Sequence, residues 1–412
     1  MKNIKLPFDL RTAERLAEEF GTPLYVYDQE GIQNTTHQIH KAFSWAKGYK
    51  NFFAVKATPT PAILKLLHDE GMGFDCSSRS ELRMMEKMGI SGADIFYTSN
   101  NTPKEDFELA IKLGATVNLD DFSQVPMFLE ALGEERIERV AARYNPGGKK
   151  SGNSLIGEPK EAKFGMPMEA LIETFSYLKQ RKVNRFGLHT MVASNELDPR
   201  YFASTARLLL EAVKEIEEHV GITFDFVNLG GGFGLNYKTN QDEFDLITAS
   251  ELVREEFEKA GRTDLQVFTE NGRYVTGPHG YLLSRVRYVM RKYKTFVGVD
   301  ASMHNLMRPG MYGSYHHITI LGKEDETVTR TYDVSGSLCE NNDKFAIDRH
   351  LPWVEPGDLL VVHDAGAHGH AMGFNYNGML RSAEVLLFNG EGTVIRKAET
   401  FEDYTRNVIW PK

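Results

Sequence analysis

The stretch NFFAVKATPTPAILKLLHDEGMGFDCSS, residues 51–78, has the pattern of a strand, a helix and a second strand. Residues 52–55 form a short apolar run, and AILKLLHDEG has the periodicity of an amphipathic helix. Lys56 closes the apolar run, although lysine is seldom fully buried because taking its ammonium out of water is costly. The stretch therefore predicts a βα unit with an amine at the end of a buried strand.

Similar strand-like runs recur along the chain, with helical patterns between them. The full set is NFFAVK (51–56), MGFDCSS (72–78), DIFYTSN (94–100), ATVNLDD (115–121), RVAARYNP (139–146), RFGLHTM (185–191), DFVNLGGG (225–232) and QVFTENGR (266–273). The centres of the first five runs lie 21, 21, 22 and 23 residues apart. PKEDFELAIKLGA and PRYFASTARLLLEAVKEIEEHV are examples of the intervening helical patterns. Eight such units predict an α/β fold, a (β/α)8 barrel of TIM type.

The pattern changes after about residue 280. TFVGVD, HHITIL, TRTYDVSG, DLLVVHD, AEVLLFN and TVIRKA are strand-like and are separated by Gly, Asp and Pro turns. A chain of 412 residues is long enough for two domains. We expect the barrel over residues 30–280 and an all-β domain, barrel-like or sandwich-like, over residues 281–412. Residues 1–29 are expected to pack with the second domain.

The composition is that of an ordinary soluble globular protein, with 41% hydrophobic and 25% charged residues. The net charge is −9 and GGKK (147–150) is the nearest approach to a basic run, so we expect no nucleic-acid partner. No segment has the apolar length of a signal-peptide core or a membrane helix, which predicts a cytoplasmic protein without a membrane partner. Cys76 and Cys339 are too few for a disulfide framework.

Polar residues collect at the carboxyl ends of the expected barrel strands, where barrel enzymes have their active sites. They are Lys56, Asp75, Arg143, His189, the glycines of 230–232, Glu270 and Arg273. In a barrel mouth, desolvation and nearby cations lower the pKa of a lysine amine and make it nucleophilic. Lys56 could then form a Schiff base with a substrate carbonyl or with pyridoxal phosphate. A solvated lysine without a chemical role is the alternative.

Three further features fit a pyridine cofactor with a phosphate. NLGGGFG (228–234) follows the seventh strand, the usual phosphate position in such barrels, although a triple glycine can also be an ordinary loop. His189 could stack on the pyridine ring or could be a hydrogen-bonded core residue. Glu270 could keep the pyridine nitrogen protonated, or it could form a salt bridge to Arg273.

A series of motifs resembles the diaminopimelate decarboxylase family over residues 20 to 405. These are YVYD, FFAVKAT, FDCSSRSE, KFGM, the His189 strand, NLGGGFG, LMRPGMYGSYHHI, SLCENND and GAHGHAMGFNYNG. RPGMYGSYHH and CENND are the specific ones, whereas the others are shared with related decarboxylases. The resemblance implies a fold-type III enzyme that uses pyridoxal 5'-phosphate, with an alanine-racemase-like barrel and a C-terminal β domain.

The resemblance also implies roles for individual residues. Around the cofactor it implies Lys56 as the Schiff-base lysine, His189 on the ring, Gly230, Gly231 and Gly232 at the phosphate, Glu270 at the pyridine nitrogen, and Gly272, Arg273 and Tyr376 as further contacts. Around the substrate it implies Arg273, Arg308 and Tyr312 at carboxylate, Glu340 at the distal ammonium, and Tyr376. Cys339 would donate the proton. In this family the cysteine loop comes from a partner subunit, which implies a homodimer with shared active sites.

The chain departs from the family pattern at two places. Where the family often has HIGS, this chain has HTMVASN, so Val192 replaces a serine that helps to bind phosphate, and Ser194 is the possible substitute. The frequent EPGR is ENGR here, with Asn271 in place of proline. Glu270 and Arg273 keep their spacing.

The implied reaction is decarboxylation of meso-2,6-diaminopimelate at its D-centre, which gives L-lysine and carbon dioxide. A decarboxylase of D-lysine, ornithine or arginine is the nearest alternative, but those substrates lack the distal carboxylate that Arg273 and Arg308 would bind.

An amino-acid racemase usually has arginine at the ring nitrogen, so Glu270 argues against it. A non-catalytic pyridoxal-phosphate carrier would not need Cys339. A metal enzyme would use His363, Asp364, His368 and His370, which lack standard ligand spacing.

Overall fold

The computed structural model describes residues 5–135, 137–152, 157–181, 183–238, 240–326 and 330–411. The chain divides into two compact units. The first unit contains residues 33–235 and 243–274, and the second contains residues 1–32, 236–242 and 275–412 as far as they are described. We describe each unit by itself.

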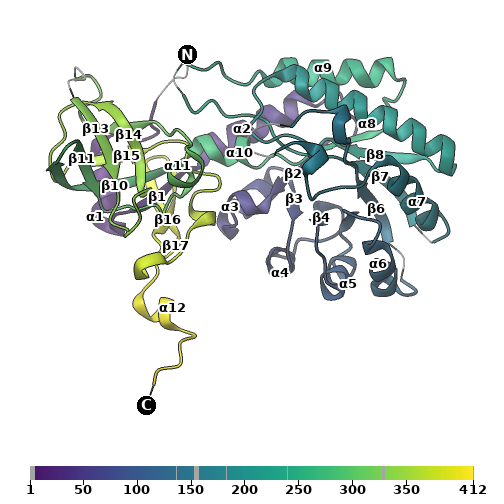
Figure 1. Cartoon of the computed structure of the whole chain (residues 1–412), viewed down its shortest axis with the longest axis horizontal. Helices are drawn as coiled ribbons and strands as arrows, with labels where there is room; N and C mark the ends of the chain where they lie inside the picture. Colours follow the sequence, from purple (N-terminus) through teal and green to yellow (C-terminus); the bar gives the residue numbers. More distant parts are fainter. Residues whose placement is uncertain are drawn as a thin grey trace. The chain divides into compact units, whose positions relative to one another are not determined.

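The first unit is a closed parallel barrel, which confirms the predicted (β/α)8 architecture (Figure 1). Its strands, in order around the barrel, are β2 (Lys50–Ala54), β3 (Gly73–Cys76), β4 (Ile95–Ser99), β5 (Thr116–Leu119), β6 (Ile137–Arg143), β7 (Val183–His189), β8 (Phe224–Asn228) and β9 (Gln266–Thr269). Pairing of β2 with β9 closes the ring. Each predicted strand-like run overlaps one of these strands, because buried parallel strands consist of short apolar runs.

Helices follow the strands and cover the outside of the barrel (Figure 1). They are α2 (Gln29–Ala42), α3 (Pro61–Asp69), α4 (Arg79–Met88), α5 (Lys104–Lys112), α6 (Gln124–Leu132), α7 (Met168–Lys179), α8 (Pro199–Val220), α9 (Leu246–Lys259) and α10 (Arg273–Thr276). The longest, α8, shows why these segments are helical. The Asp198 side chain accepts a hydrogen bond from the backbone of Arg200, proline occupies the first turn, and Gly221 ends the helix with a φ of 66°.

Aromatic side chains fill the interior of the barrel. Phe52, Phe96, Phe226 and Phe268 pack together, with centroid distances of 5.4 Å for Phe52–Phe96 and 5.0 Å for Phe226–Phe268. The Phe96 ring also contacts the His189 ring at 6.0 Å between centroids. The aromatic core therefore supports the polar end of the barrel, where His189 lies.

The second unit is built on a nine-stranded sheet of described residues. Its main order is β14 (Lys344–Leu351), β13 (Arg330–Ser335), β11 (Thr295–Val299), β10 (Gly280–Arg291), β1 (Leu24–Asp28), β16 (Ala383–Phe388) and β17 (Glu391–Arg396), while β15 (Leu359–Val362) pairs with β10 and with β12 (Ile318–Ile320). Three short helices belong to this unit: α1 (Leu10–Phe20), α11 (Arg308–Tyr312) and α12 (Phe401–Thr405). The six strands predicted after residue 280 are present, and β1, β10 and β14 are additional.

The N-terminal strand β1 lies inside this sheet, antiparallel to β10 and parallel to β16. Leu24 and Val26 are fully buried in a core that includes Leu16 of α1, Leu283 of β10 and Val385 of β16. Segments from both ends of the chain therefore share one hydrophobic core. Among the residues that the structure describes, none of the helices has the length and apolar character needed to cross a membrane.

Candidate active site

Lys56 lies at the mouth of the barrel, in a single 3₁₀ turn (Val55–Ala57) that follows β2. Its neighbours Val55 and Ala57 are buried, whereas 58% of the lysine side chain is exposed. The Nζ atom lies 3.9 Å from Oδ2 of Asp75, a long ion-pair distance. The amine is thus held by a buried backbone and remains accessible to a ligand.

Asp75, near the end of β3, is a buried carboxyl with an incomplete set of partners. Within the described residues its Oδ1 atom has no hydrogen-bond partner. Burial, followed by the negative charge of Glu270, raises the pKa of Asp75 well above its usual value, while Lys56 and Arg143 act in the opposite direction. The ionised form of this side chain is therefore costly in the absence of a further cation or donor.

His189 and Glu270 form a buried pair at the ends of β7 and β9. The His189 Nε2 atom lies 3.2 Å from Glu270 Oε2, and Asn228 Nδ2 donates to Glu270 Oε1 at 2.7 Å. Burial acts to raise the pKa of Glu270, but His189, Lys56 and Arg143 together hold that pKa below its usual value. Glu270 is therefore an ionised carboxylate inside the barrel mouth.

Asn118 on β5 fixes the hydrogen bonding of the histidine from its other side. Its Nδ2 atom donates to His189 Nδ1 at 2.9 Å and to Thr98 Oγ1 at 3.1 Å. Since Nδ1 accepts a hydrogen bond, the ring proton is on Nε2 and points toward Glu270. Sequence reasoning missed Asn118 and Asn228; a single asparagine within each apolar strand was the signal that could have identified them.

The turn after β8, residues 230–232, is called the glycine turn here. Gly230 and Gly232 have φ angles of +70° and +109°. A Cβ atom at Gly230 would lie 2.3 Å from the Thr190 carbonyl oxygen, and one at Gly232 would lie 2.7 Å from that of Ala193. Only glycine fits both the conformation and the space. The Gly230 amide donates to Asn228 Oδ1 at 3.0 Å and the Gly231 amide to Met191 Sδ at 3.2 Å. Glycine-rich turns can bind anions through their backbone amides.

The ENGR segment connects three parts of the site. The Asn271 amide donates to Asn51 Oδ1 at 2.9 Å, and Asn271 Oδ1 accepts from the Phe233 amide at 3.0 Å. Proline at this position would lose both bonds, because it has neither an N–H nor a side-chain acceptor. A Cβ atom at Gly272 would lie 2.8 Å from that of Ala57, so Gly272 allows close packing beside the lysine turn.

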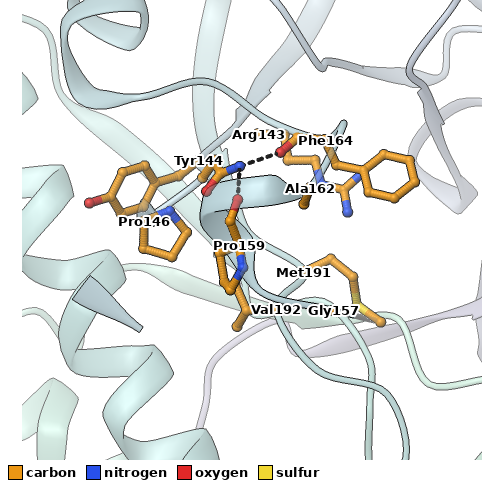
Figure 2. Close-up of a pocket in the computed structure, with 10 residues that line it drawn as sticks. Arg143, Tyr144, Pro146, Gly157, Pro159, Ala162, Phe164, Met191 and Val192 are labelled. Atoms are coloured by element: carbon orange, nitrogen blue, oxygen red, sulfur yellow. Dashed lines mark hydrogen bonds between the residues drawn. The ribbon is translucent and has the colours of Figure 1, made fainter. Parts of the chain in front are cut away.

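A small hollow, open to solvent, lies beside the ends of β6 and β7 (Figure 2). Arg143, Phe164, Met191 and Val192 are among its lining residues. The Arg143 guanidinium lies 3.2 Å from Asp120 Oδ1 and 4.6 Å from the centroid of the Phe164 ring. The Asn145 side chain donates to the carbonyl oxygens of Pro159 and Phe164, at 2.9 and 2.8 Å.

Arg273 belongs to the first unit, where its Nη2 atom donates to Ser194 Oγ at 3.4 Å. The predicted residues Cys339, Glu340, Tyr376, Arg308 and Tyr312 belong to the second unit. The Cys339 amide donates to Asn377 Oδ1 at 2.8 Å, and Asn377 follows Tyr376 in the chain. The side chains of Cys339, Glu340 and Tyr376 are exposed. One hydrogen bond thus brings the cysteine loop next to the tyrosine turn within this unit.

The two predicted substrate residues of α11 differ in exposure. Arg308 begins the helix and is buried, with Nη2 3.3 Å from Ser314 Oγ and its guanidinium 5.5 Å from the Tyr237 ring centroid. Tyr312 ends the helix and is 52% exposed. The helix therefore carries one fixed guanidinium and one accessible phenol.

The histidines considered as metal ligands have hydrogen bonds within the second unit. His363 Nε2 lies 2.8 Å from Thr319 Oγ1, and His370 Nε2 lies 3.0 Å from the Ser382 carbonyl oxygen. Burial lowers the pKa of His370 to about 4. Across the described residues, no three His, Cys, Asp or Glu side chains are grouped as a metal ion would require.

Comparison with known proteins agrees with this architecture. A family model described as "Pyridoxal-dependent decarboxylase, pyridoxal binding domain" matches residues 29–277. Protein TabA of Pseudomonas amygdali pv. tabaci is 41% identical over 96% of this chain and 93% of its own length. Diaminopimelate decarboxylase of Methanothermobacter thermautotrophicus is 33% identical over 96% of this chain and 93% of its own. The crystal structure of diaminopimelate decarboxylase from M. jannaschii with L-lysine has a TM-score of 0.90 and 31% identity, covering 97% and 94% of the two chains.

Proposed function

The chain belongs to the pyridoxal-dependent decarboxylases, and from that membership we propose that it decarboxylates meso-2,6-diaminopimelate at the D-centre. The products are L-lysine and carbon dioxide. The cofactor of the family is pyridoxal 5'-phosphate. The observation that carries the reaction type is the ionised Glu270 at the barrel mouth, because an acceptor there keeps a pyridinium nitrogen protonated.

The residues of the barrel fit this cofactor in three respects. Lys56 offers an accessible amine for its aldehyde, and the glycine turn offers a cradle that a Cβ atom would fill. Glu270 has lone pairs beyond the two already used by His189 and Asn228, so it can accept a further hydrogen bond. His189, fixed by Asn118, would lie against the ring, while Gly272 and Arg273 complete the same side of the site. Bound pyridoxal phosphate supplies an electron sink for the bond that breaks.

Recognition of the substrate falls to the second unit and to Arg273. Arg308 and Arg273 would bind carboxylates through their guanidinium groups, and Tyr312 and Tyr376 would donate from their hydroxyls. Glu340 would pair with the distal ammonium. In this proposal Arg308 would bind the distal carboxylate of the substrate, a group that D-lysine and ornithine lack.

Cys339 would return a proton to the α-carbon after carbon dioxide has left. Its thiol is free and exposed, and its backbone is fixed by Asn377. A free thiol with this role requires a reducing compartment, which supports a cytoplasmic location. In this proposal residues 30–280 form the pyridoxal-phosphate-binding barrel and residues 281–412 the C-terminal β domain, with which residues 1–29 pack.

The assembly in this proposal is a homodimer with active sites shared between subunits. The exposure of Cys339, Glu340, Tyr312 and Tyr376 in a single chain supports it, because groups with chemical roles are usually enclosed in a working site. A second copy that covers these residues would complete both sites at once.

Measurement of carbon dioxide release tests the function. The purified protein with pyridoxal phosphate is given meso-diaminopimelate, D-lysine, L-ornithine or L-arginine at equal concentration. We expect release from meso-diaminopimelate with the highest kcat/KM, and L-lysine as the second product. Preference for a basic amino acid without a distal carboxylate would overturn the substrate. Exchange of the α-hydrogen with solvent deuterium, without carbon dioxide, would indicate a racemase.

A further inference from the structure

Glu399, between β17 and α12, holds both ends of one surface segment of the second unit. Its Oε2 atom accepts hydrogen bonds from Asn375 Nδ2 at 2.7 Å and from the Arg381 backbone amide at 2.9 Å. The Glu399 amide donates in turn to the Arg381 carbonyl oxygen at 3.0 Å. One carboxylate oxygen therefore closes the neck of residues 375–381, the tyrosine turn, which carries Tyr376.

The backbone inside the tyrosine turn has an unusual conformation. Asn377 has a φ of 58° and Gly378 a φ of 68°, in the left-handed region that is unfavourable for a residue with a Cβ atom. The Asn375 side chain also donates to the Met379 carbonyl oxygen at 2.9 Å, and the Gly378 amide donates to the Asn375 carbonyl oxygen at 3.0 Å. Asn375 thus links the conformation of the turn to its anchor, Glu399.

The left-handed residue of this turn supports the cysteine loop, residues 336–343. Asn377 Oδ1 accepts from the Cys339 amide at 2.8 Å. The preceding Leu338 amide donates instead to Asp343 Oδ2 at 2.8 Å, a bond within the loop itself. The backbone of Cys339 is therefore tied to the tyrosine turn, whereas that of Leu338 is tied to its own loop.

We propose that Glu399 is a positioning residue for Tyr376 and Cys339, acting through the neck of the tyrosine turn. Both side chains are exposed, so they gain little from packing and their places depend on the hydrogen bonds of the surrounding backbone. The proposal rests on the proposed function, in which Tyr376 binds the substrate and Cys339 donates a proton. It adds a residue that acts on both through Asn375 and Asn377.

Hydrogen exchange at the Cys339 amide tests the coupling without any substrate. The full-length protein with pyridoxal phosphate is transferred to deuterated water, and peptides around residue 339 are followed by mass spectrometry. We expect Glu399→Ala to speed exchange of this amide roughly tenfold, because the Asn377 acceptor loses its anchor. Asn377→Gly suits the left-handed backbone and removes the acceptor itself, so it sets the upper limit of the rate. The buried strand β15 is the internal reference.

Release of carbon dioxide from meso-diaminopimelate tests the consequence for the reaction. Glu399→Ala should lower kcat roughly tenfold through the displaced Cys339 and raise KM through the displaced Tyr376. Glu399→Gln should restore both constants, because a carboxamide oxygen can accept two hydrogen bonds as the carboxylate oxygen does. Glu402→Ala is the matched control, since Glu402 is an exposed glutamate in the first turn of α12, and it should behave as the wild type.

Other results would overturn the proposal. A wild-type rate of exchange at Cys339 in Glu399→Ala would show that the cysteine loop keeps its place without this anchor. Faster exchange that extends to β15 would show that Glu399 stabilises the whole unit instead. Equal losses of activity in Glu399→Ala and Glu399→Gln would exclude an action through the two hydrogen bonds. Absence of carbon dioxide release by the wild-type protein would refute the proposed function itself, and the role of Glu399 in that reaction with it.

Discussion

His189 and Glu270 share a buried hydrogen bond, with 3.2 Å between Nε2 and Oε2. Asn118 donates to the other ring nitrogen, so the histidine presents its Nε2 proton to the carboxylate. Asn228 binds the second carboxylate oxygen. Three side chains, from β5, β7 and β8, thus fix the orientation of one anion at the barrel mouth.

Glu270→Gln should therefore reduce decarboxylation far more than it reduces cofactor binding. The amide cannot hold a pyridinium proton, and its nitrogen would face either the Nε2 proton of His189 or the amide of Asn228, donor against donor. We expect kcat to fall roughly a hundredfold or more, as when one preorganised electrostatic group is removed. Steady-state kinetics with a parallel cofactor titration measures both effects. Glu218→Gln on the exposed face of α8 is the control, and an equal loss in both variants would contradict the role of Glu270.

Asp75 gives a prediction about stability of the cofactor-free protein. Its folded pKa is raised, chiefly by burial and by Glu270, so the folded state binds more protons than the unfolded state between the two pKa values. Its contribution to the free energy of unfolding therefore decreases as the pH rises from the unfolded pKa toward the folded pKa. At neutral pH, Asp75→Asn should stabilise the cofactor-free protein by about 1 kcal/mol, and the gain should shrink as the pH falls.

Thermal unfolding at pH 5 and pH 7.5 measures the effect of Asp75→Asn. Asp120→Asn is the matched control, since Asp120 is buried next to the Arg143 guanidinium at 3.2 Å and removal of its charge leaves that cation unpaired. The control should lower the melting temperature at both pH values. A lower melting temperature for Asp75→Asn at neutral pH would show that its ionised form is stabilising.

The sequence alone was sufficient to predict the barrel and many of the polar residues at its mouth, for a physical reason. Buried parallel strands consist of short apolar runs, and a lysine or glutamate that ends such a run can be recognised from the sequence alone. Asn118 and Asn228 stand out in the sequence as single polar residues inside apolar runs, but their roles could not be predicted, because their partners come from other strands. Strand β10 was missed because it leaves the core part-way: its first five residues are buried and its last residues are not. Strand β1 pairs with β16 from the other end of the chain, a contact that no local pattern encodes.

Lys56 should be the residue that carries the cofactor. The wild-type protein with bound cofactor is expected to be yellow. Borohydride reduction should attach the cofactor irreversibly to the one peptide that contains Lys56. Mass spectrometry of the digested protein locates the label, and Lys56→Ala should abolish it. Lys150, which is partly buried and has a pKa lowered to about 8 chiefly by burial, is the matched alternative amine. A label on Lys150 would refute the assignment of Lys56.

Cys339→Ala should slow turnover much more than it weakens binding of pyridoxal phosphate. The thiol would act only after carbon dioxide has left, and removal of a group that acts in a single chemical step lowers kcat without loss of the ground-state complex. Removal of a positioned proton donor typically costs 10²- to 10⁴-fold in rate. Cys76→Ala is a control for loss of a thiol, because Cys76 is buried within β3. A Cys339→Ala variant that loses the cofactor and keeps its rate would exclude the proton-donor role.

The shared active site can be tested with two inactive proteins. Lys56→Ala and Cys339→Ala are each expected to be inactive, since one lacks the cofactor amine and the other the proton donor. If Cys339 completes the site of the neighbouring subunit, a mixed dimer has one site with both lesions and one site with both residues intact. Random exchange of subunits makes about half of the dimers mixed, so roughly a quarter of wild-type activity should return when sites act independently. Native mass spectrometry verifies the exchange. Verified exchange without recovery of activity would place Lys56 and Cys339 in a site formed by one chain.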